Sequence, residues 1–337
     1  MATFSEQAPS VSSTGSSSRA VRLARLLKKV AKVGVVVVGS VVGLVVVALA
    51  ITGLLSADRI EIPPNHLGHY INVKGEKIRY YQTGTGPDIL LIHGLPGLVE
   101  DWKPIFDAAA GKYRVTAYDR PGHGYRAAPS DYTLAHNADV ALGLIDQLQL
   151  KDVIVVGHSY GGAVVLAMAV RNPPKVRAFV SLAGVTAPHP EGLNVLDPVR
   201  LPLVGRGLAT VASRTMGQGM VRAGMSNSFS PDETHLTSEI LDERVSVFLQ
   251  TKVIVALARE VASFNHDLAV VEPGLATIGK PLCFIHGESD KLVPLTQVKA
   301  FHERFPSTSL TVLKDTGHAV PFAHPEAVMS VIDSLRK

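Results

Sequence analysis

The chain has 337 residues, a net charge of +4 and a single cysteine, Cys283. Residues 1–57 carry six Lys or Arg and one acidic residue, so residues 58–337 have a net charge of −1. This balance argues against a nucleic-acid-binding domain, which needs a basic face, and a lone cysteine excludes an intrachain disulfide. Because Cys283 lies in the apolar run Pro281-Leu-Cys-Phe-Ile, we expect a buried, unreactive thiol.

The N-terminal segment has a polar start, a basic cluster and a long uncharged run. Residues 1–18 are rich in Ser, and with the basic cluster they predict a disordered basic tail over residues 1–32. Residues 33–55 carry no charge, and 23 residues of helix at about 1.5 Å each can cross the ~30 Å hydrocarbon core. We expect a single transmembrane anchor with its N-terminus in the cytoplasm and the rest exported, because basic residues mark the cytoplasmic side of a span.

A cleaved signal peptide is the alternative for this segment, and Ala48-Leu49-Ala50 offers a small-x-small cleavage site. The apolar region of a signal peptide runs about 7 to 15 residues, and the present one is longer. Its length therefore favours an uncleaved anchor.

Beyond an extended linker at residues 58–67, short apolar runs alternate with helical segments. Strands are expected at residues 69–73, 77–82, 88–93, 114–118, 153–156, 178–182, 282–285 and 310–313. Helices are expected between them at residues 134–148, 162–171, 296–305 and 325–335. Such alternation predicts a mostly parallel sheet. Residues 185–274 lack buried-strand runs, so we expect a helical insertion there, between core segments at residues 58–184 and 275–337.

The pentapeptide Gly157-His158-Ser159-Tyr160-Gly161 lies between a predicted strand and a predicted helix. GxSxG in that context is typical of a nucleophile elbow, a sharp turn that lifts the serine Oγ above the sheet edge. Gly157 and Gly161 are expected where a Cβ would crowd the turn. The alternative, a structural turn with an inert serine, does not require these flanking elements.

Two residues further along the chain complete a catalytic set with Ser159. A serine hydroxyl needs a base to become a nucleophile, and the base needs an orienting acid. Asp290 and His318 each follow a predicted strand, in the order Ser, acid, His that is typical of this kind of elbow. We predict the triad Ser159, Asp290 and His318. Two other carboxylates compete for the acid's role: Glu191, after the preceding strand, and Asp315, whose tight loop places it poorly for His318.

The segment His93-Gly94-Leu95-Pro96-Gly97 follows the third predicted strand. An oxyanion hole pairs the amide after the nucleophile with one from such a loop, so we expect the N–H groups of Leu95 and Tyr160 to form it. Gly94 permits close approach of the backbone. His93, at the end of its strand, is expected to have a structural hydrogen-bonding role.

Five motifs occur in a fixed order: HGLPG, DRPGHG at residues 119–124, GHSYGG, HGESD and DTGH. Over about residues 68–337 the chain resembles the α/β-hydrolase superfamily. It is most similar to the capped branch that holds esterases, haloperoxidase-like proteins, C–C-bond hydrolases, epoxide hydrolases and haloalkane dehalogenases. The resemblance implies an α/β-hydrolase fold with an eight-stranded sheet, and it implies that residues 185–274 form a helical cap. The motifs are much less specific for substrate than for fold.

Two departures narrow the expected chemistry. Ser159 stands where epoxide hydrolases and dehalogenases carry a nucleophilic Asp, and Leu95 replaces the polar residue with which dehalogenases hold halide. Both favour acyl transfer. Three methionines of the expected cap, Met216, Met220 and Met225, are expected either to line an adaptable apolar pocket or to pack within the cap's own core.

The sequence therefore predicts a membrane-anchored serine hydrolase that cleaves carboxylic esters or related acyl compounds. Alternatives on the same triad are a cofactor-free haloperoxidase or perhydrolase and a C–C or lactone hydrolase. A non-catalytic binding pseudo-hydrolase is the alternative from another class, and it would not require an intact triad. No HExxH, GxGxxG or P-loop motif is present, so no metal or nucleotide cofactor is expected. The expected partners are a small apolar acyl substrate and the membrane.

Overall fold

The computed structural model describes residues 14–56, 67–126, 129, 131–188 and 194–337, with side chains from residue 22 onward. Eight strands form one sheet in the order β1-β2-β4-β3-β5-β6-β7-β8. Their bounds are β1 His69–Val73, β2 Glu76–Thr83, β3 Asp88–Ile92, β4 Arg114–Tyr118, β5 Val153–His158, β6 Val176–Leu182, β7 Leu282–Gly287 and β8 Ser309–Leu313. β2 pairs antiparallel with β1 and β4, and all other neighbours are parallel. The predicted mostly parallel, eight-stranded sheet is confirmed.

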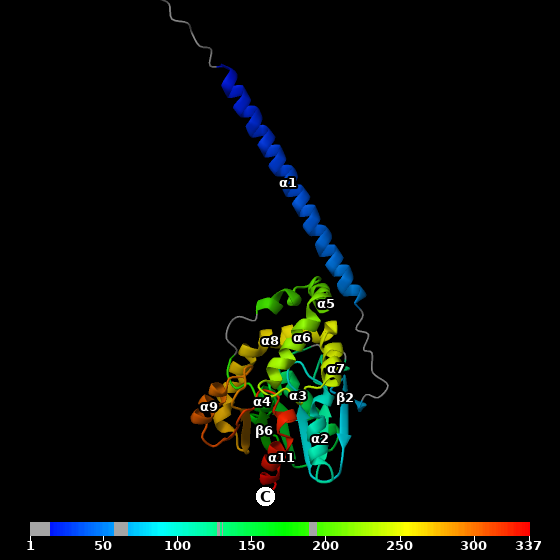
Figure 1. Ribbon diagram of the computed structural model, residues 1–337, viewed down its shortest axis with the longest axis vertical. Coiled ribbons are helices and arrows are strands. Elements are labelled where there is room, and N and C mark those ends of the chain that lie inside the picture. The colour runs from blue at the N-terminus through cyan, green and yellow to red at the C-terminus, as the bar shows by residue number, and fades with distance from the viewer. Residues whose placement is uncertain (1–13, 57–66, 127–128, 130, 189–193) are drawn as a thin grey trace, which may run out of the picture.

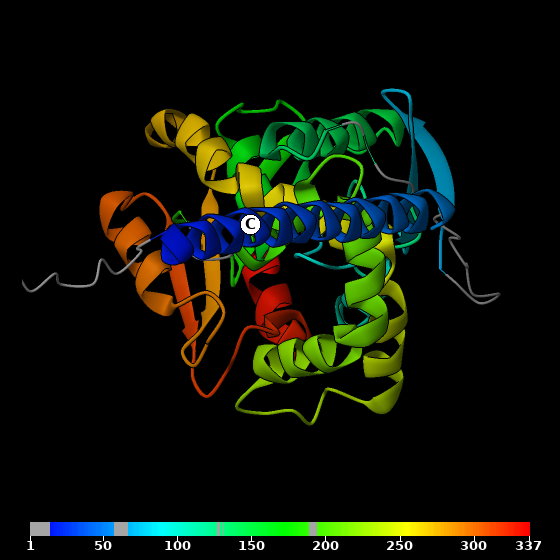
Figure 2. The same cartoon turned by 90° about the horizontal axis from the view of Figure 1, so that it is seen from above.

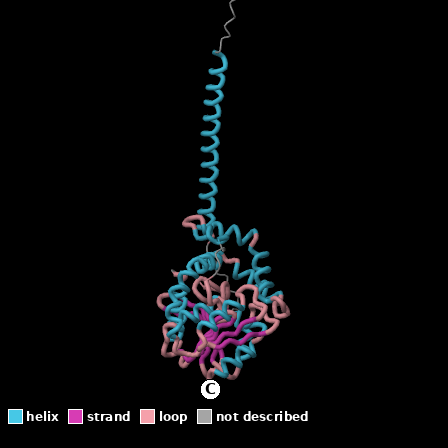
Figure 3. The backbone as a smooth tube through the Cα atoms, turned by 90° about the vertical axis from the view of Figure 1, so that its left-hand side faces the viewer, coloured by secondary structure: helices cyan, strands magenta, loops and turns pink. Residues whose placement is uncertain are grey.

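Helices cover both faces of the sheet, which lies inside the domain (Figure 3). The α-helices are α1 Thr14–Leu55, α2 Lys103–Ala109, α3 Leu134–Gln147, α4 Tyr160–Ala169, α5 Gly205–Thr215, α6 Gly217–Phe229, α7 Ser238–Phe248, α8 Thr251–Val271, α9 Leu295–Arg304, α10 Val320–Ala323 and α11 Pro325–Ser334. The 3₁₀ helices are η1 Val99–Trp102, η2 Asn194–Arg200 and η3 Glu272–Thr277.

An apolar layer covers each face of the sheet, so its central strands are buried on both sides. Within β3, Leu90 and Ile92 belong to an apolar cluster that also contains residues of α3, α4 and α9. Ile89 and Leu91 point to the other face, against α2 and α11. Apolar side chains on both faces, over residues 89–92, are typical of a parallel strand that is covered on both sides. The sheet is therefore rigid, and its carboxyl edge can hold loops in fixed places.

The chain leaves the sheet after β6 and returns at β7, and the described residues between them form η2, α5, α6, α7, α8 and η3. We call the described part of this segment, residues 194–277, the insertion. Figure 1 shows α5 to α8 between α1 and the sheet. Buried cations join the insertion to the core: Arg244 Nε donates to Asp101 Oδ1 at 2.8 Å, and Lys252 Nζ donates to the carbonyl of Gly124 at 2.6 Å.

The N-terminal helix is longer than predicted. α1 runs from Thr14, so residues 14–32, which the sequence predicted to be disordered, are helical. Ala, Leu, Arg and Lys are strong helix formers, and a segment that extends an existing helix does not bear the cost of nucleation. Within residues 22–55 α1 is long and apolar enough to cross a membrane by length and composition. Residues 1–13 of the predicted tail and residues 58–66 of the predicted linker lie outside the described residues.

The methionines of the insertion differ from the expectation that they line a pocket or fill a core. Met216 and Met220 are exposed, and only Met225 packs on a buried cluster, which contains Tyr125 and Phe248. The exposure of a methionine side chain depends on how the helices pack, which the local sequence does not reveal. Cys283 is buried, as expected.

Candidate active site

Ser159 lies at the tight turn between β5 and α4, as the GxSxG pattern predicted. Its φ of 56° and ψ of −119° place a non-glycine residue in a region that favours glycine. Two neighbours hold the turn: Ser159 N donates to the carbonyl of Leu182 at 2.9 Å, and Gly162 N donates to the carbonyl of Ser159 at 2.9 Å. Strain that the surrounding structure maintains in this way is common at functional sites.

Gly157 and Gly161 are required by close packing at the elbow. A Cβ on Gly157 would lie 2.1 Å from the carbonyl oxygen of Gly161. A Cβ on Gly161 would lie 2.2 Å from the carbonyl oxygen of Ile92, at the end of β3. Neither position can carry a side chain without moving the backbone. The second contact also brings the start of α4 against the loop that follows β3.

Asp290 and His318 form a hydrogen-bonded pair at the carboxyl edge of the sheet. His318 Nδ1 donates to Asp290 Oδ2 at 2.8 Å, and both side chains are almost fully buried. The other carboxylate oxygen of Asp290 accepts from the N–H groups of Leu292 at 2.8 Å and Val293 at 2.9 Å. Asp290 thus has the contacts expected of an acid that orients a histidine and fixes its tautomer.

Electrostatics keep Asp290 ionised. Burial opposes its negative charge, but the hydrogen bond and charge of His318 and the N–H of Val293 outweigh burial and lower the pKa of Asp290 below its ordinary value. Of the two competing carboxylates, Asp315 is exposed, and His318 Nδ1 bonds to Asp290 instead. Glu191 lies outside the described residues.

Ser159 and His318 come from neighbouring loops that His158 connects. His158 Nε2 donates to the carbonyl of His318 at 2.9 Å, and the two imidazole centroids are 4.8 Å apart. Burial, with a smaller contribution from His318, lowers the pKa of His158 to about 3, so its ring is neutral. Within the described chain no hydrogen bond joins Ser159 Oγ to His318. In apo enzymes this contact is often loose and tightens only with substrate.

The loop after β3 lies directly beside the nucleophile. A Cβ on Gly94 would be 3.0 Å from the Cβ of Ser159. The backbone of Leu95, the next residue, therefore passes close to Ser159 on one side. On the other side Tyr160 is the first residue of α4, where an N–H has no partner within the helix. This arrangement suits the predicted oxyanion hole, whose two donors must lie on either side of the reacting carbonyl oxygen.

A buried network around Arg120 fixes the same loop. Arg120 Nε donates to the carbonyl of His93 at 3.1 Å, and Nη2 donates to the carbonyl of Gly94 at 3.0 Å. His93 Nε2 accepts from Arg120 N at 2.8 Å, so its Nδ1 carries the proton donated to the Gly94 carbonyl. His93 thus makes the hydrogen bonds that its predicted structural role requires, and burial holds its pKa well below the usual range.

The acidic partner in this network comes from the insertion. Glu260, on α8, accepts from Arg120 Nη1 at 2.6 Å and from His123 Nε2 at 2.8 Å, with all three side chains fully buried. Burial disfavours the charged carboxylate, but Arg120 and His123 outweigh it and lower the pKa of Glu260. The Arg120 guanidinium also lies 4.5 Å from the ring centroid of Tyr160. Sequence reasoning included Arg120 only within a family motif and missed Glu260, for which no local pattern exists.

No group of three His, Cys, Asp or Glu side chains that could hold a metal ion occurs in the described part of the chain. A cavity of about 390 Å³ lies away from the triad. It adjoins Pro281 and Leu282, at the amino end of β7, and is also lined by Phe301 of α9 and Leu275 of η3. The carboxyl edge of the sheet, where Ser159, Asp290 and His318 gather, is the candidate active site.

Comparison with known protein families shows the family to which the chain belongs. A family model described as "Alpha/beta hydrolase family" matches residues 89–331, about seven-tenths of the chain. The chain belongs to this alpha/beta hydrolase family. The match spans the sheet from β3 to β8, the insertion and all three residues of the predicted triad.

Two bacterial relatives match this alpha/beta hydrolase over 93% of their own length. An uncharacterized hydrolase, YugF of Bacillus subtilis, is 26% identical over 263 residues, which is 76% of this chain and 93% of the relative. The 2-hydroxymuconate semialdehyde hydrolase of Pseudomonas putida is 25% identical over 280 residues, 80% of this chain and 93% of the relative. The crystal structure of a thermophilic esterase from Thermogutta terrifontis superposes with a TM-score of 0.66 at 20% identity, over 80% of this chain and 98% of the esterase. That likeness supports the fold alone.

Proposed function

We propose that this alpha/beta hydrolase is a serine esterase that cleaves carboxylic esters or close acyl relatives through a Ser159 acyl-enzyme. The observation that carries the proposal is the 2.8 Å bond between His318 Nδ1 and Asp290 Oδ2, in loops adjoining a strained Ser159. A neutral histidine whose Nδ1–H is held by a buried carboxylate presents Nε2 as a base. In the proposed reaction that base takes the proton of Ser159 Oγ.

The reaction follows from these positions. Ser159 Oγ attacks the acyl carbon while its proton moves to His318 Nε2, and the carbonyl oxygen gains negative charge. The N–H groups of Leu95 and Tyr160 stabilise this oxyanion, and Asp290 stabilises the imidazolium. His318 then gives the proton to the departing alcohol. Water, deprotonated by His318, attacks the acyl-enzyme, and Ser159 leaves with the proton.

The rest of the chain has a place in this proposal. Residues 58–184 and 275–337 form the catalytic core, and residues 185–274 form a cap above its carboxyl edge. Residues 33–55 of α1 cross a membrane once, with the catalytic domain on the extracytoplasmic side. The supporting observations are the apolar length of α1 and the basic residues before the span.

A second candidate reaction comes from a relative. The Pseudomonas putida protein is named a 2-hydroxymuconate semialdehyde hydrolase, and a Ser-His-Asp set could serve that substrate class as well. A panel of short and long acyl esters, an enol-lactone and a semialdehyde, each with and without peroxide, distinguishes these reactions from perhydrolase chemistry.

Labelling tests the nucleophile directly. Full-length protein in detergent should react with a fluorophosphonate probe and lose ester hydrolysis in proportion to labelling, whereas Ser159→Ala should not label. A matched control is Ser181→Ala, because Ser181 is a buried serine of β6 outside the proposed triad. An unlabelled wild-type protein, or labelling that persists in Ser159→Ala, would contradict the proposal.

A further inference from the structure

An apolar surface lies on the outer part of the insertion. Beyond α1, nine large apolar side chains of the described chain are exposed, and six of them fall within residues 195–220. We call these six the apolar face: Val195, Leu201, Leu203, Val211, Met216 and Met220. Leu203 is 82% exposed and Val195 71% exposed, values that a soluble surface rarely gives to grouped aliphatic side chains. Large exposed apolar patches mark interaction sites on soluble proteins, and these six side chains are the candidate for one.

The same elements carry a concentration of positive charge. From η2 to the end of α6 the chain has four arginines and one acidic residue, Asp197, a net charge of +3. The remaining residues after position 57 are therefore net negative. Arg200 pairs with Asp197 at 2.9 Å, and Arg222 pairs with Asp242 at 2.9 Å. Apolar side chains mixed with arginine are the composition that an interfacial membrane surface requires.

α1 packs directly on this surface. A Cβ on Gly207 of α5 would lie 2.1 Å from the carbonyl oxygen of Leu49, so the two helices are in backbone contact. Arg206 Nη2 donates to the carbonyl of Ser56 at 2.8 Å, and the hydroxyls of Ser56 and Thr210 are 2.7 Å apart. Figure 1 shows α5 at the end of the domain that α1 joins, and Figure 2 shows α1 across that end.

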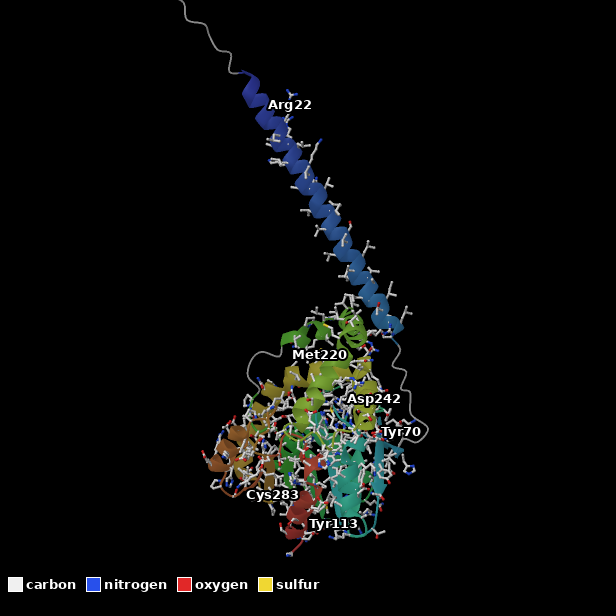
Figure 4. The ribbon with its side chains drawn as sticks, viewed as in Figure 1. Arg22, Tyr70, Tyr113, Met220, Asp242 and Cys283 are labelled. Carbon is white, nitrogen blue, oxygen red and sulfur yellow. The ribbon has the colours of Figure 1, made fainter. Side chains whose placement is uncertain are left out.

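The contact fixes the depth of α5 relative to a membrane. Leu49 lies six residues before Leu55, the end of both α1 and its uncharged run, a distance of about 9 Å along the helix. If residues 33–55 fill the hydrocarbon core, α5 meets α1 at or just inside the boundary of that core. The outermost part of the core and the headgroup region then surround η2 and α5. Figure 4 places Met220 between α1 and the sheet, with Tyr113 at the opposite end of the domain.

We propose that the apolar face docks in the headgroup region of an anionic bilayer, the same membrane that α1 enters. This inference rests on the proposed transmembrane role of α1. The exposed segment Leu201-Pro202-Leu203, between η2 and α5, inserts its leucines among the acyl chains. The exposed Arg214, in the last turn of α5, binds a lipid phosphate.

Docking would deliver the substrate from the bilayer, because the docked helices also contact the loops of the active site. Ser228, in α6, accepts hydrogen bonds from the N–H groups of His318 at 2.9 Å and Ala319 at 3.0 Å. Thr210 of α5 bonds Thr251 of α8 at 3.0 Å, and α8 carries Glu260 to the oxyanion loop. An insertion seated in lipid places its helices between bilayer and triad. The substrate class is an ester that partitions into the bilayer.

Site-specific quenching tests the docking without any need for activity. Full-length Cys283→Ser protein, carrying one environment-sensitive label at Leu203→Cys, Val37→Cys or Val270→Cys, is reconstituted in vesicles of phosphatidylcholine and phosphatidylglycerol. Val270 is an exposed side chain outside the apolar face. Labels at 37 and 203 should be quenched by nitroxide-bearing lipid and protected from aqueous acrylamide, and the label at 270 should show the reverse. If nitroxide-bearing lipid quenches the label at 37 but acrylamide quenches the label at 203, the docking is overturned and the span stands. If acrylamide quenches the label at 37, the span and the docking are overturned together.

An activity comparison tests the substrate class. Arg214→Glu and Leu203→Glu should slow hydrolysis of a long-chain ester embedded in anionic vesicles by about fivefold or more. Hydrolysis of water-soluble 4-nitrophenyl acetate should be unchanged, and Val270→Glu should alter neither rate. Equal loss on both substrates, or on neither, overturns bilayer delivery. If wild-type protein hydrolyses no ester, the proposed esterase function and the substrate class fail, while the quenching result still decides the docking.

Discussion

Glu260 Oε1 accepts a hydrogen bond from Arg120 Nη1 at 2.6 Å, and this fully buried ion pair joins α8 of the insertion to the loop beside Ser159. Arg120 in turn donates to the carbonyls of His93 and Gly94. The position of the predicted oxyanion loop thus depends on a carboxylate that does not touch the reacting atoms. Glu260 is a positioning residue in the proposed enzyme.

Glu260→Gln should lower kcat for ester hydrolysis by about 10- to 100-fold with a small change in KM. A neutral amide holds Arg120 less firmly, and sub-ångström movement of the oxyanion donors is costly in the transition state. The matched control is Asp88→Asn, which weakens an ion pair with Arg114 at the amino edge of the sheet. Equal loss of kcat in both variants, after correction for folded fraction, would assign Glu260 a purely structural role.

The triad should behave as a unit. Ser159→Ala and His318→Ala should each reduce kcat by several orders of magnitude, and the double variant should lose little more, because each residue acts only with the other. Full additivity of the two losses would contradict the triad. The measurement is single-turnover hydrolysis of an activated ester by full-length protein, with circular dichroism to check folding.

Asp290→Asn should preserve the fold and reduce kcat on the order of 10⁴-fold, since an amide cannot hold His318 in the tautomer that leaves Nε2 free to accept a proton. Glu191→Gln serves as the comparison because Glu191 is the competing acid. If Glu191→Gln loses most of its kcat while Asp290→Asn keeps nearly all of it, the triad's acid would be Glu191 and not Asp290.

His158 should make the protein sensitive to acid. Its pKa is about 3 in the folded chain because of burial, and about 6.5 in an unfolded chain. Between these values the unfolded state binds a proton that the native state does not, so the free energy of unfolding falls as the pH falls from 6.5 toward 3. The stabilisation is fully present above pH 6.5.

Replacement of His158 tests this linkage. In His158→Gln the side-chain amide can still donate to the His318 carbonyl, and proton uptake on unfolding should fall by about one between pH 6.5 and 3. Burial also lowers the pKa values of three other histidines, His93, His123 and His286. Their proton uptake on unfolding should remain. Denaturant unfolding at several pH values gives the slope, and exposed His235→Gln is the control. An unchanged slope in His158→Gln would refute the assignment.

Much of the fold could be predicted from the sequence, because apolar runs such as residues 89–92 are buried on both faces and lie between turn-forming residues, here Pro87 and Gly94. The positions of Ser159, Asp290 and His318 after β5, β7 and β8 were informative because parallel strands bring their carboxyl ends to one edge of the sheet. Contacts between distant elements could not be predicted. Glu260 lies 140 residues from Arg120 along the chain, and a single Glu in a helix usually faces solvent.

The exposure of Met216 and Met220 was unpredictable on the same grounds, since it depends on where α5 and α6 pack. The start of α1 at Thr14 also differed from expectation. A Ser-rich composition predicts disorder when the segment stands alone, whereas here residues 14–32 continue a stable apolar helix.

The membrane prediction concerns the fate and orientation of α1. We expect the mature protein to keep residues 33–55 and to resist extraction by high salt, because burial of some twenty apolar residues holds it while screened charges do not. Six Lys and Arg precede the span, and Arg59 is the first basic residue after it, so the N-terminus should remain in the cytoplasm. Protease added to spheroplasts should digest the catalytic domain and leave an N-terminal tag protected. A mature N-terminus at Ile51 would instead establish cleavage after Ala50 and a released enzyme. If the catalytic domain is fully protected, it lies in the cytoplasm, and the apolar face of the insertion would then meet the inner leaflet.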